Sequence, residues 1–223
     1  ESLDELARVL RDHDVRVLSD EVYEHVVFDG VAHASVLAHP ELRERSLAVL
    51  SFGKTLHVTG WRVGCCVATR PLTTEFRKVH QFNTYTIATP LQLGIARYLQ
   101  DGDACWSGLA AFFQRKRDLL GAALQGSGFE PLPSRGTYFQ LLDYSALADA
   151  PGVEFADALI REGGVALIPL SPFYQAPPAM RLLRICFAKR DETLALAAER
   201  LRAFARHPGR PTVARAAPAT ALA

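Results

Sequence analysis

A lysine, a serine and an arginine lie close together in residues 51–64, SFGKTLHVTGWRVG. Lys54 comes shortly after an apolar run, residues 47–50, and Ser51 directly follows that run. A lysine held away from water loses its charge readily and becomes a nucleophilic amine that condenses with aldehydes. The alternative is a lysine whose stem lies on the core while its ammonium reaches water. The residues around Lys54 bear on which of these hypotheses holds.

The neighbours of Lys54 carry groups that suit a phosphorylated ligand. Arg62 offers a planar fork that matches phosphate oxygens, and Ser51 offers a hydroxyl. Asp20 follows another apolar run, residues 15–18. If the two runs are parallel strands, their carboxyl ends meet where such folds collect ligands. An imine-forming amine, a phosphate clamp and a carboxylate together predict an aldehyde cofactor with a phosphate and a basic ring nitrogen, as in pyridoxal 5′-phosphate.

The elements that must position these groups follow from the hydrophobic pattern. Apolar runs at residues 15–18, 47–50 and 63–68 predict short strands, with helical patterns between them. Runs apolar on both faces are typical of parallel strands buried in an α/β layer fold. Beyond Gly128 the pattern predicts a smaller α+β unit. Helices are expected over residues 2–13, 89–99, 103–124, 153–162 and 191–205, and later strands over 137–142, 165–168 and 182–187.

Composition narrows the classes of function. The chain has 223 residues, 49% of them apolar, and a formal net charge of +1, which gives no electrostatic case for nucleic acid or membrane as a partner. No apolar run approaches the ~20 residues that span a bilayer. The four cysteines lack metal-ligand spacing and no HExxH motif occurs, so no metal site is expected. Unpaired cysteines indicate a reducing compartment, the cytoplasm.

Four motifs carry a resemblance to a known family. They are SDEVYEHVVFDG (19–30), SFGKTLHVTGWRVG (51–64), GTYFQLLDYS (136–145) and RLLRICFAKRDETL (181–194). With these four motifs in this order, residues 1–205 of the chain resemble the class I/II aminotransferases of PLP fold type I. It is most similar to their methionine/aromatic and kynurenine aminotransferase branch. The resemblance implies the C-terminal part of a mostly parallel α/β large domain, followed by a smaller α+β domain.

The resemblance also implies roles for residues around the cofactor. Lys54 would form the Schiff base with pyridoxal 5′-phosphate and, once released, would move a proton between Cα and C4′. Asp20 would pair with the pyridine nitrogen and keep it protonated. Tyr23 would donate to the phenolic oxygen of the ring. Ser51 and Arg62 would bind the phosphate.

Two further residues are implied to act on the substrate. Arg184 would hold the α-carboxylate of the amino acid through a bidentate pair, with Arg181 as the competing candidate. Tyr85 matches a position from which the family sends an aromatic ring into the active site of the neighbouring subunit. A tyrosine packed in the core is the alternative reading of Tyr85.

The implied function is transfer of an amino group from an amino acid to a 2-oxo acid by a homodimer with shared active sites. The amino donor would be of the methionine, aromatic, glutamine or kynurenine type. A carbon–sulfur β-lyase would use the same cofactor, and fold alone does not separate the two. A third reading is the PLP-sensing domain of a transcription regulator.

Members of this family are considerably longer than the chain, and an upstream part is expected to supply further cofactor contacts. The resemblance assigns residues 1–98 to the C-terminal part of the PLP-binding large domain. Residues 99–207 would form the small C-terminal domain. The Pro/Ala-rich residues 208–223 carry no apolar pattern, and we expect a disordered tail there.

Overall fold

The computed structural model describes residues 2–206, apart from the side chains of residues 103 and 105. The expected tail at residues 208–223 lies outside the described residues. The chain divides into two compact units. The first holds the residues up to Gln114 together with Arg135–Thr137, and the second holds Arg115–Ser134 and the residues from Tyr138 onward. The domain boundary after residue 98 stays a prediction.

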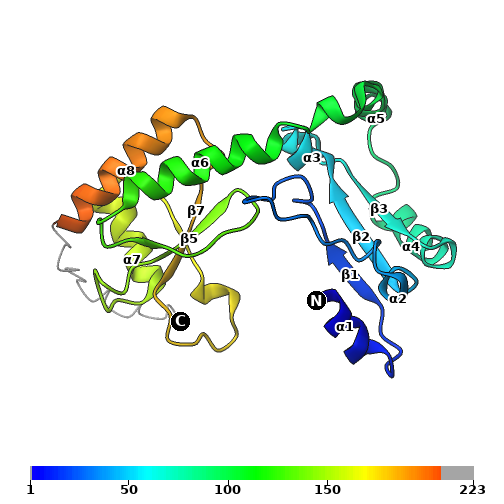
Figure 1. Ribbon diagram of the computed structural model, residues 1–223, viewed down its shortest axis with the longest axis horizontal. Helices are drawn as coiled ribbons and strands as arrows, with labels where there is room; N and C mark the ends of the chain where they lie inside the picture. Colours follow the sequence, from blue (N-terminus) through cyan, green and yellow to red (C-terminus); the bar gives the residue numbers. More distant parts are fainter. Residues whose placement is uncertain (1, 207–223) are drawn as a thin grey trace, which may run out of the picture. The chain divides into compact units, whose positions relative to one another are not determined.

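The first unit is built on a three-stranded sheet in the order β1-β2-β3 (Figure 1). Strand β1 (Val17–Asp20) pairs with β2 (Ser46–Ser51) in parallel. Strand β3 (Gly64–Ala68) pairs with β2 in antiparallel orientation. The three apolar runs therefore form strands as predicted, but the expectation of parallel strands is wrong for β3. The twelve residues between Ser51 and Gly64 reverse the direction of the chain, so β3 runs back alongside β2 in antiparallel orientation.

Two helices of the first unit pack on one face of this sheet. The helical segments of the first unit are α1 (Ser2–Leu10), α2 (Pro40–Arg43), α3 (Phe52–Thr55), η1 (Thr59–Trp61), α4 (Arg70–Asn83), α5 (Thr89–Tyr98), η2 (Leu99–Cys105) and the start of α6 (Leu109–Leu124). Ala7 of α1, Leu42 of α2 and Ala48 of β2 are buried together with Val36. The other face is more open, since Leu18 is 73% exposed. Burial on both faces, expected for the run that forms β1, is therefore not observed there.

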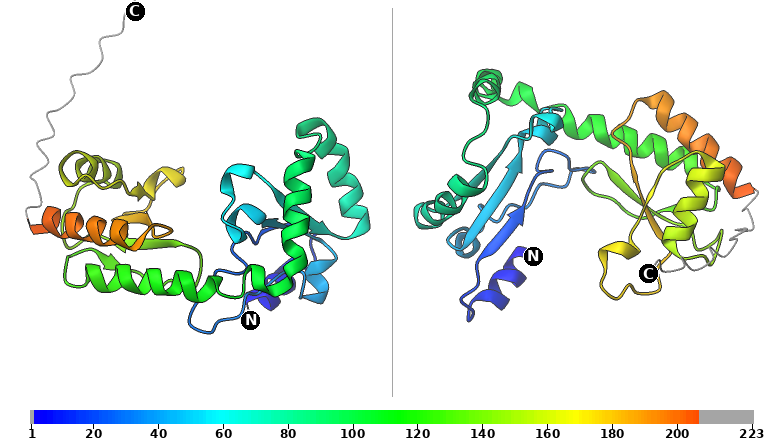
Figure 2. Two further views of the ribbon diagram at one scale, coloured as in Figure 1. Left: turned by 90° about the horizontal axis from the view of Figure 1, so that it is seen from above. Right: turned by 180° about the vertical axis from the view of Figure 1, so that it is seen from behind.

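The second unit is an antiparallel sheet packed against helices. Its strands are β4 (Glu130–Pro131), β5 (Phe139–Asp143), β6 (Ile168–Pro169) and β7 (Leu182–Cys186), in the order β4-β5-β7-β6. Its helical segments are α7 (Gly152–Ala158), the π-helix η3 (Leu159–Gly163), η4 (Ser171–Phe173) and α8 (Asp191–Arg206). Helix α8 lies beside the second half of α6 (Figure 2). It buries the predicted stripe Leu194, Ala198, Leu201 and Phe204.

The helix expected over residues 103–124 begins later in the structure than predicted. The 3₁₀ segment η2 kinks at Gly102, which has a φ of 65°, and α6 begins only at Leu109. A positive φ at this position is accessible to glycine at little cost. None of the described helices is long and apolar enough to cross a membrane.

The start of α8 is held by two cations from α6. Asp191 accepts hydrogen bonds from Arg115 Nη1 at 2.8 Å and from Lys116 Nζ at 2.7 Å. Lys116 is buried and also donates to the carbonyl of Lys189 at 2.6 Å. The hydrogen bonds from Arg115 and Lys116 lower the pKa of the Asp191 carboxyl from 3.8 to about 2. The unfolded chain therefore takes up this proton at a higher pH than the folded chain does.

This pairing predicts a pH-dependent contribution to stability. We expect Asp191→Asn to lower the melting temperature at pH 7 by about 2–4 °C. Because the pKa is lower in the folded state, the stabilisation is complete well above pH 4 and is lost as the pH falls toward 2. Thermal unfolding of both variants from pH 7 to pH 3 measures this, with Glu192→Gln as a neighbouring control. A gap between wild type and Asp191→Asn that stays constant through pH 3 contradicts the assignment.

Candidate functional site

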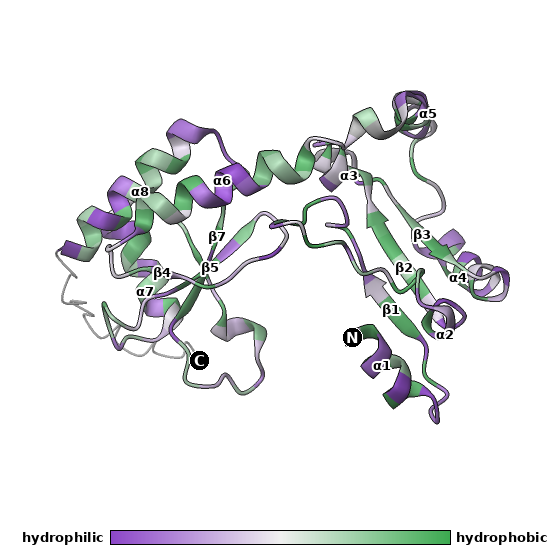
Figure 3. Ribbon diagram, viewed as in Figure 1, coloured by the Kyte–Doolittle hydropathy of each residue, from purple (hydrophilic) through white to green (hydrophobic). Residues whose placement is uncertain are grey.

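The strand register brings three of the predicted site residues to one edge of the first sheet. Asp20 ends β1 and pairs with Val49, two residues before the end of β2 at Ser51. Residues that lie opposite or two apart on neighbouring strands share a face, so Asp20 and Ser51 are on the same face. Gly64 begins β3 opposite Ser51, which places Arg62 just outside this edge. The hydrophobic strand β2 leads directly to these polar groups (Figure 3).

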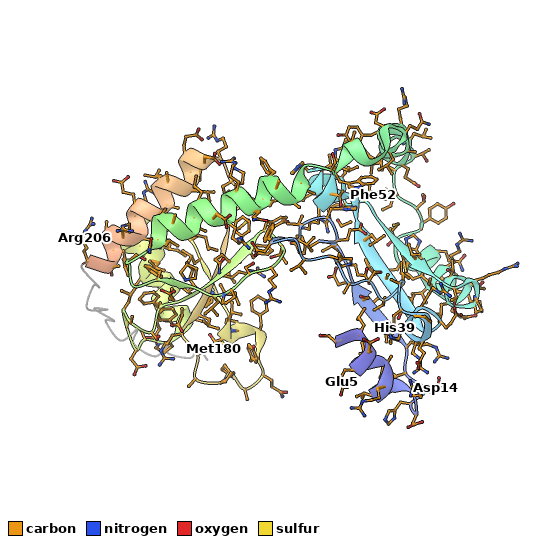
Figure 4. All side chains as sticks on the ribbon, in the orientation of Figure 1. Glu5, Asp14, His39, Phe52, Met180 and Arg206 are labelled. Carbon is orange, nitrogen blue, oxygen red and sulfur yellow. The ribbon has the colours of Figure 1, made fainter. Side chains whose placement is uncertain are left out.

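Lys54 is carried by the short helix that follows β2. Helix α3 begins at Phe52, labelled at the end of β2 in Figure 4, and Lys54 is half-buried within it. The helix packs tightly on the backbone of η1. A Cβ at Gly53 would lie 3.0 Å from Thr59 Cα and 3.4 Å from Ser51 Oγ, so the chain needs a small residue there. The lysine thus lies three residues beyond Ser51 on a turn whose position is constrained on both sides.

Arg62 is held by an unusual backbone conformation. Its φ and ψ are 57° and 36°, in the left-handed region that non-glycine residues seldom occupy. Its Nη1 donates to the carbonyl of Thr59 at 3.2 Å. The close approach of β3 to β2 leaves no room for a side chain at Gly64, where a Cβ would lie 2.5 Å from the carbonyl oxygen of Leu50. Strain of this kind is often concentrated at functional sites.

Asp20 and Tyr23 lie on a tight turn after β1. The exposed Asp20 carboxylate accepts from the backbone N–H of Val22 at 3.3 Å, and Tyr23 is half-buried. Residues 135–137 then pair with the chain just beyond the turn, through a bridge from Gly136 to Val27. Tyr23 therefore lies between the end of β1 at Asp20 and the segment that is anchored by the bridge at Val27.

Sequence reasoning missed one charged residue at this edge. Glu21 is only 5% exposed, and its carboxylate lies among the donors His33, Val36 and Ser19. Burial raises its pKa, but the hydrogen bonds outweigh burial and hold the pKa below its usual value. The two-residue period of a strand was the available signal, because it places Glu21 on the face opposite Asp20.

The two arginines that competed for the carboxylate role differ clearly within the second unit. Arg181 forms an ion pair with Asp149 and donates to backbone carbonyls. Arg184, in the centre of the sheet on β7, has no ion-pair partner among the described residues. The buried Nε of each arginine has no hydrogen-bond partner, so this atom does not separate the two. Its guanidinium lies 4.2 Å from the ring centre of Phe139 and 5.8 Å from that of Phe173. Such a stacked, unpaired fork suits a carboxylate ligand.

Tyr85 is placed away from any core. It lies in the loop between α4 and α5, is 81% exposed and has a φ of 65°. Its side chain has no hydrogen bond or ring contact within the described part of the chain. The reading of Tyr85 as a core tyrosine is therefore wrong for the chain as described here.

The groups at the sheet edge fit the cofactor that the sequence predicts. The edge offers an amine on Lys54, a carboxylate on Asp20, a hydroxyl on Ser51 and a guanidinium on Arg62. The amine matches an aldehyde, the carboxylate matches a basic ring nitrogen, and the hydroxyl and the guanidinium match a phosphate. Asp20 ends β1 and Ser51 ends β2, while Lys54 and Arg62 lie in the connection that follows β2, so all four groups come from strand ends or the chain just beyond them, as in other α/β ligand sites.

Comparisons with known proteins agree with this chemistry. A family model described as aminotransferase class I and II matches residues 1–201. A methionine aminotransferase from Escherichia coli (strain K12) is 52% identical over 197 residues, covering 88% of this chain and 51% of that protein. Human kynurenine–oxoglutarate transaminase 1 is 31% identical over 223 residues, covering 91% of this chain and 53% of that protein. The chain spans about half the length of the curated relatives it matches.

A solved structure supports the same relationship. The crystal structure of an Escherichia coli protein with a methionine aminotransferase function matches with a TM-score of 0.87 and 51% sequence identity. The match covers 90% of this chain and 53% of that one.

The two glycines that flank Arg62 give a matched test of the edge. Gly64→Ala should force β3 away from the carbonyl of Leu50 and should lower the free energy of unfolding by about 1–3 kcal/mol. Because Arg62 precedes this strand, affinity for pyridoxal 5′-phosphate should fall as well. Urea unfolding and cofactor titration of the complete protein measure both effects.

Gly60→Ala is the control for this experiment. A Cβ at Gly60 meets no atom within 4 Å, so both quantities should stay near their wild-type values. Equal behaviour of the two variants would show that the contact between β2 and β3 does not position the site.

Proposed function

The chain belongs to the class I and II aminotransferases, and from this we propose that the complete protein is a pyridoxal-phosphate-dependent aminotransferase. It would transfer an amino group from an amino acid of the methionine, aromatic, glutamine or kynurenine type to a 2-oxo acid. The observation that carries this proposal is the meeting of Lys54, Asp20, Ser51 and Arg62 at one sheet edge. The names of the matched relatives favour the transferase over the β-lyase and the regulator.

The cofactor would be held by the residues of the first unit. Arg62 and Ser51 would bind the phosphate through charge-assisted and hydroxyl hydrogen bonds. Asp20 would place its carboxylate beside the ring nitrogen and stabilise a positive charge there. Tyr23 would donate a hydrogen bond from its O–H to the phenolic oxygen of the ring. We propose further that residues 1–98 belong to the cofactor-binding domain and residues 99–207 to a smaller domain.

The chemistry divides between the cofactor and the chain. When bound, pyridoxal 5′-phosphate supplies an aldehyde that condenses with amines and a ring that withdraws electrons from the α-carbon of the substrate. Lys54 would act as the base that takes the proton from this α-carbon and returns it to C4′ of the cofactor. Its place on the half-buried helix that follows β2 puts this amine at the same sheet edge as Asp20 and Ser51.

Arg184 would fix the amino acid by its α-carboxylate. Two observations support this role over one for Arg181: Arg184 lacks an ion-pair partner among the described residues, whereas Arg181 pairs with Asp149, and its guanidinium stacks on Phe139. A bidentate pair would set the direction of the Cα–H bond relative to the base.

We propose that the complete protein is a homodimer with shared active sites. Helix α4 exposes Phe76, Val79 and Phe82, at 39%, 68% and 88%, and Tyr85 follows directly at 81%. An apolar surface of this kind is typical of an interaction site. Tyr85 would reach the active site of the partner subunit.

We propose that the protein is located in the cytoplasm. The cysteines Cys65, Cys66 and Cys186 are free thiols, which supports this location.

Lys54→Ala tests the central role in the complete protein. The variant should lose the visible absorbance of the covalently held cofactor, and formation of the new amino acid should fall by about 10⁴-fold. Lys78→Ala is the matched control, because Lys78 is exposed on α4 and pairs only with Glu75 among the described residues. Turnover by Lys54→Ala at the rate of Lys78→Ala would end the proposal.

Arg184→Lys tests the substrate contact. Lysine keeps the charge but not the fork, so KM for the amino donor should rise about 10- to 100-fold, as expected for a lost charge-assisted hydrogen bond. Arg181→Lys should change KM by less than about twofold, because its partner Asp149 is exposed. Steady-state kinetics with one amino donor distinguish the two. A larger rise in Arg181→Lys would assign the carboxylate to that residue instead.

A further inference from the structure

The chain direction after β1 separates two neighbouring carboxylates. Leu18 and Asp20 are exposed on one face of β1, whereas Glu21 turns to the opposite face and is 5% exposed. The backbone N–H of Glu21 donates to the carbonyl of Val49 at 2.9 Å and so extends the pairing of β1 with β2. Glu21 is thus fixed through its backbone directly beside Asp20.

The Glu21 side chain ties this strand end to a distant loop. Its Oε1 accepts from the backbone N–H of Val36 and from Ser19 Oγ, both at 3.0 Å. Its Oε2 lies 3.0 Å from His33 Nε2. A buried carboxylate is costly unless donors surround it, and here the side chains of Ser19, His33 and Ser35 and the backbone amide of Val36 do so. The loop end at Val36 is in turn packed in the core with Ala7 and Leu42.

These contacts restrain the residue that precedes Glu21. Asp20 is exposed, and its carboxylate accepts a hydrogen bond from the N–H of Val22 in the same turn. The direction of its side chain therefore depends on how firmly the turn is held from behind. Glu21 supplies that restraint through the hydrogen bond of its backbone to β2 and through the hydrogen bonds of its carboxylate to the loop.

We propose that Glu21, with His33 as its hydrogen-bond partner, is a positioning residue that sets the orientation of Asp20 toward the ring nitrogen of the cofactor. This inference rests on the proposed function, which gives Asp20 its role. The alternative is that Glu21 contributes to folding alone. A variant that loses a buried hydrogen bond elsewhere in the same sheet distinguishes these two possibilities.

Ser46 provides that matched control. It is fully buried at the start of β2, and its Oγ donates to the carbonyl of Leu42 at 2.6 Å. It pairs with Val17, at the end of β1 remote from Asp20. Ser46→Ala removes one buried side-chain hydrogen bond from the same unit without touching the turn at residues 20–23.

The experiment uses the complete protein with pyridoxal 5′-phosphate labelled with ¹⁵N in the ring. The ¹⁵N chemical shift reports the protonation of the ring nitrogen, and Asp20→Asn gives the reference signal for loss of its partner. In Glu21→Ala we expect the signal to move toward that reference. The dissociation constant for the cofactor should rise about 10- to 100-fold, the range found for outer-shell partners of metal ligands.

Two further variants complete the test. Glu21→Gln keeps an acceptor for Val36 and an amide group for His33, and should restore the wild-type signal. Ser46→Ala should lower the melting temperature but change the dissociation constant by less than about twofold, as for independent sites. If Glu21→Ala matches Ser46→Ala in signal and affinity, the positioning role is refuted. If wild type binds no cofactor, the proposed function fails first, and the two failures are distinguishable.

Discussion

The pairing of β2 with both of its neighbours is the constraint on which the site depends. The parallel ladder aligns Asp20 with Val49, and the antiparallel ladder aligns Gly64 with Ser51. A shift of either register by one residue would turn the side chains of that strand to the other face of the sheet. Together the two ladders bring a carboxylate, a hydroxyl and, through the connections, an amine and a guanidinium to one edge.

Keeping these groups together carries local costs that other residues offset. Arg62 occupies a left-handed conformation, and Gly64 gives up its side chain to let β3 approach Leu50. Glu21 is buried as a carboxylate next to the exposed Asp20, and its hydrogen bonds compensate for lost hydration. In the second unit, Arg184 keeps a buried Nε without a partner, which favours a ligand that can supply one.

The sequence predicted the parts of the site that depend on local pattern. Apolar runs indicated β1 and β2, and the groups at their ends indicated the cofactor. The predicted fold class, part of an α/β fold type I domain followed by a smaller α+β domain, is confirmed by the structural match. The antiparallel direction of β3 depends on how α3 and η1 fold back, which no periodicity records. The partners of Glu21 lie up to fifteen residues away in an irregular loop, so pattern alone could not find them. Arg181 and Arg184 became distinguishable only once Asp149 and Phe139 were placed.

The proposed chemistry depends on the amine of Lys54 being the group that condenses with the cofactor aldehyde. Borohydride reduction of the complete protein with pyridoxal 5′-phosphate makes such a link permanent, and peptide mapping by mass spectrometry then locates it. The chain described here has four lysines, Lys54, Lys78, Lys116 and Lys189. We expect the peptide map to show the reduced cofactor on the peptide that contains Lys54. Its appearance on a peptide with any other lysine, or on none, would contradict the assignment.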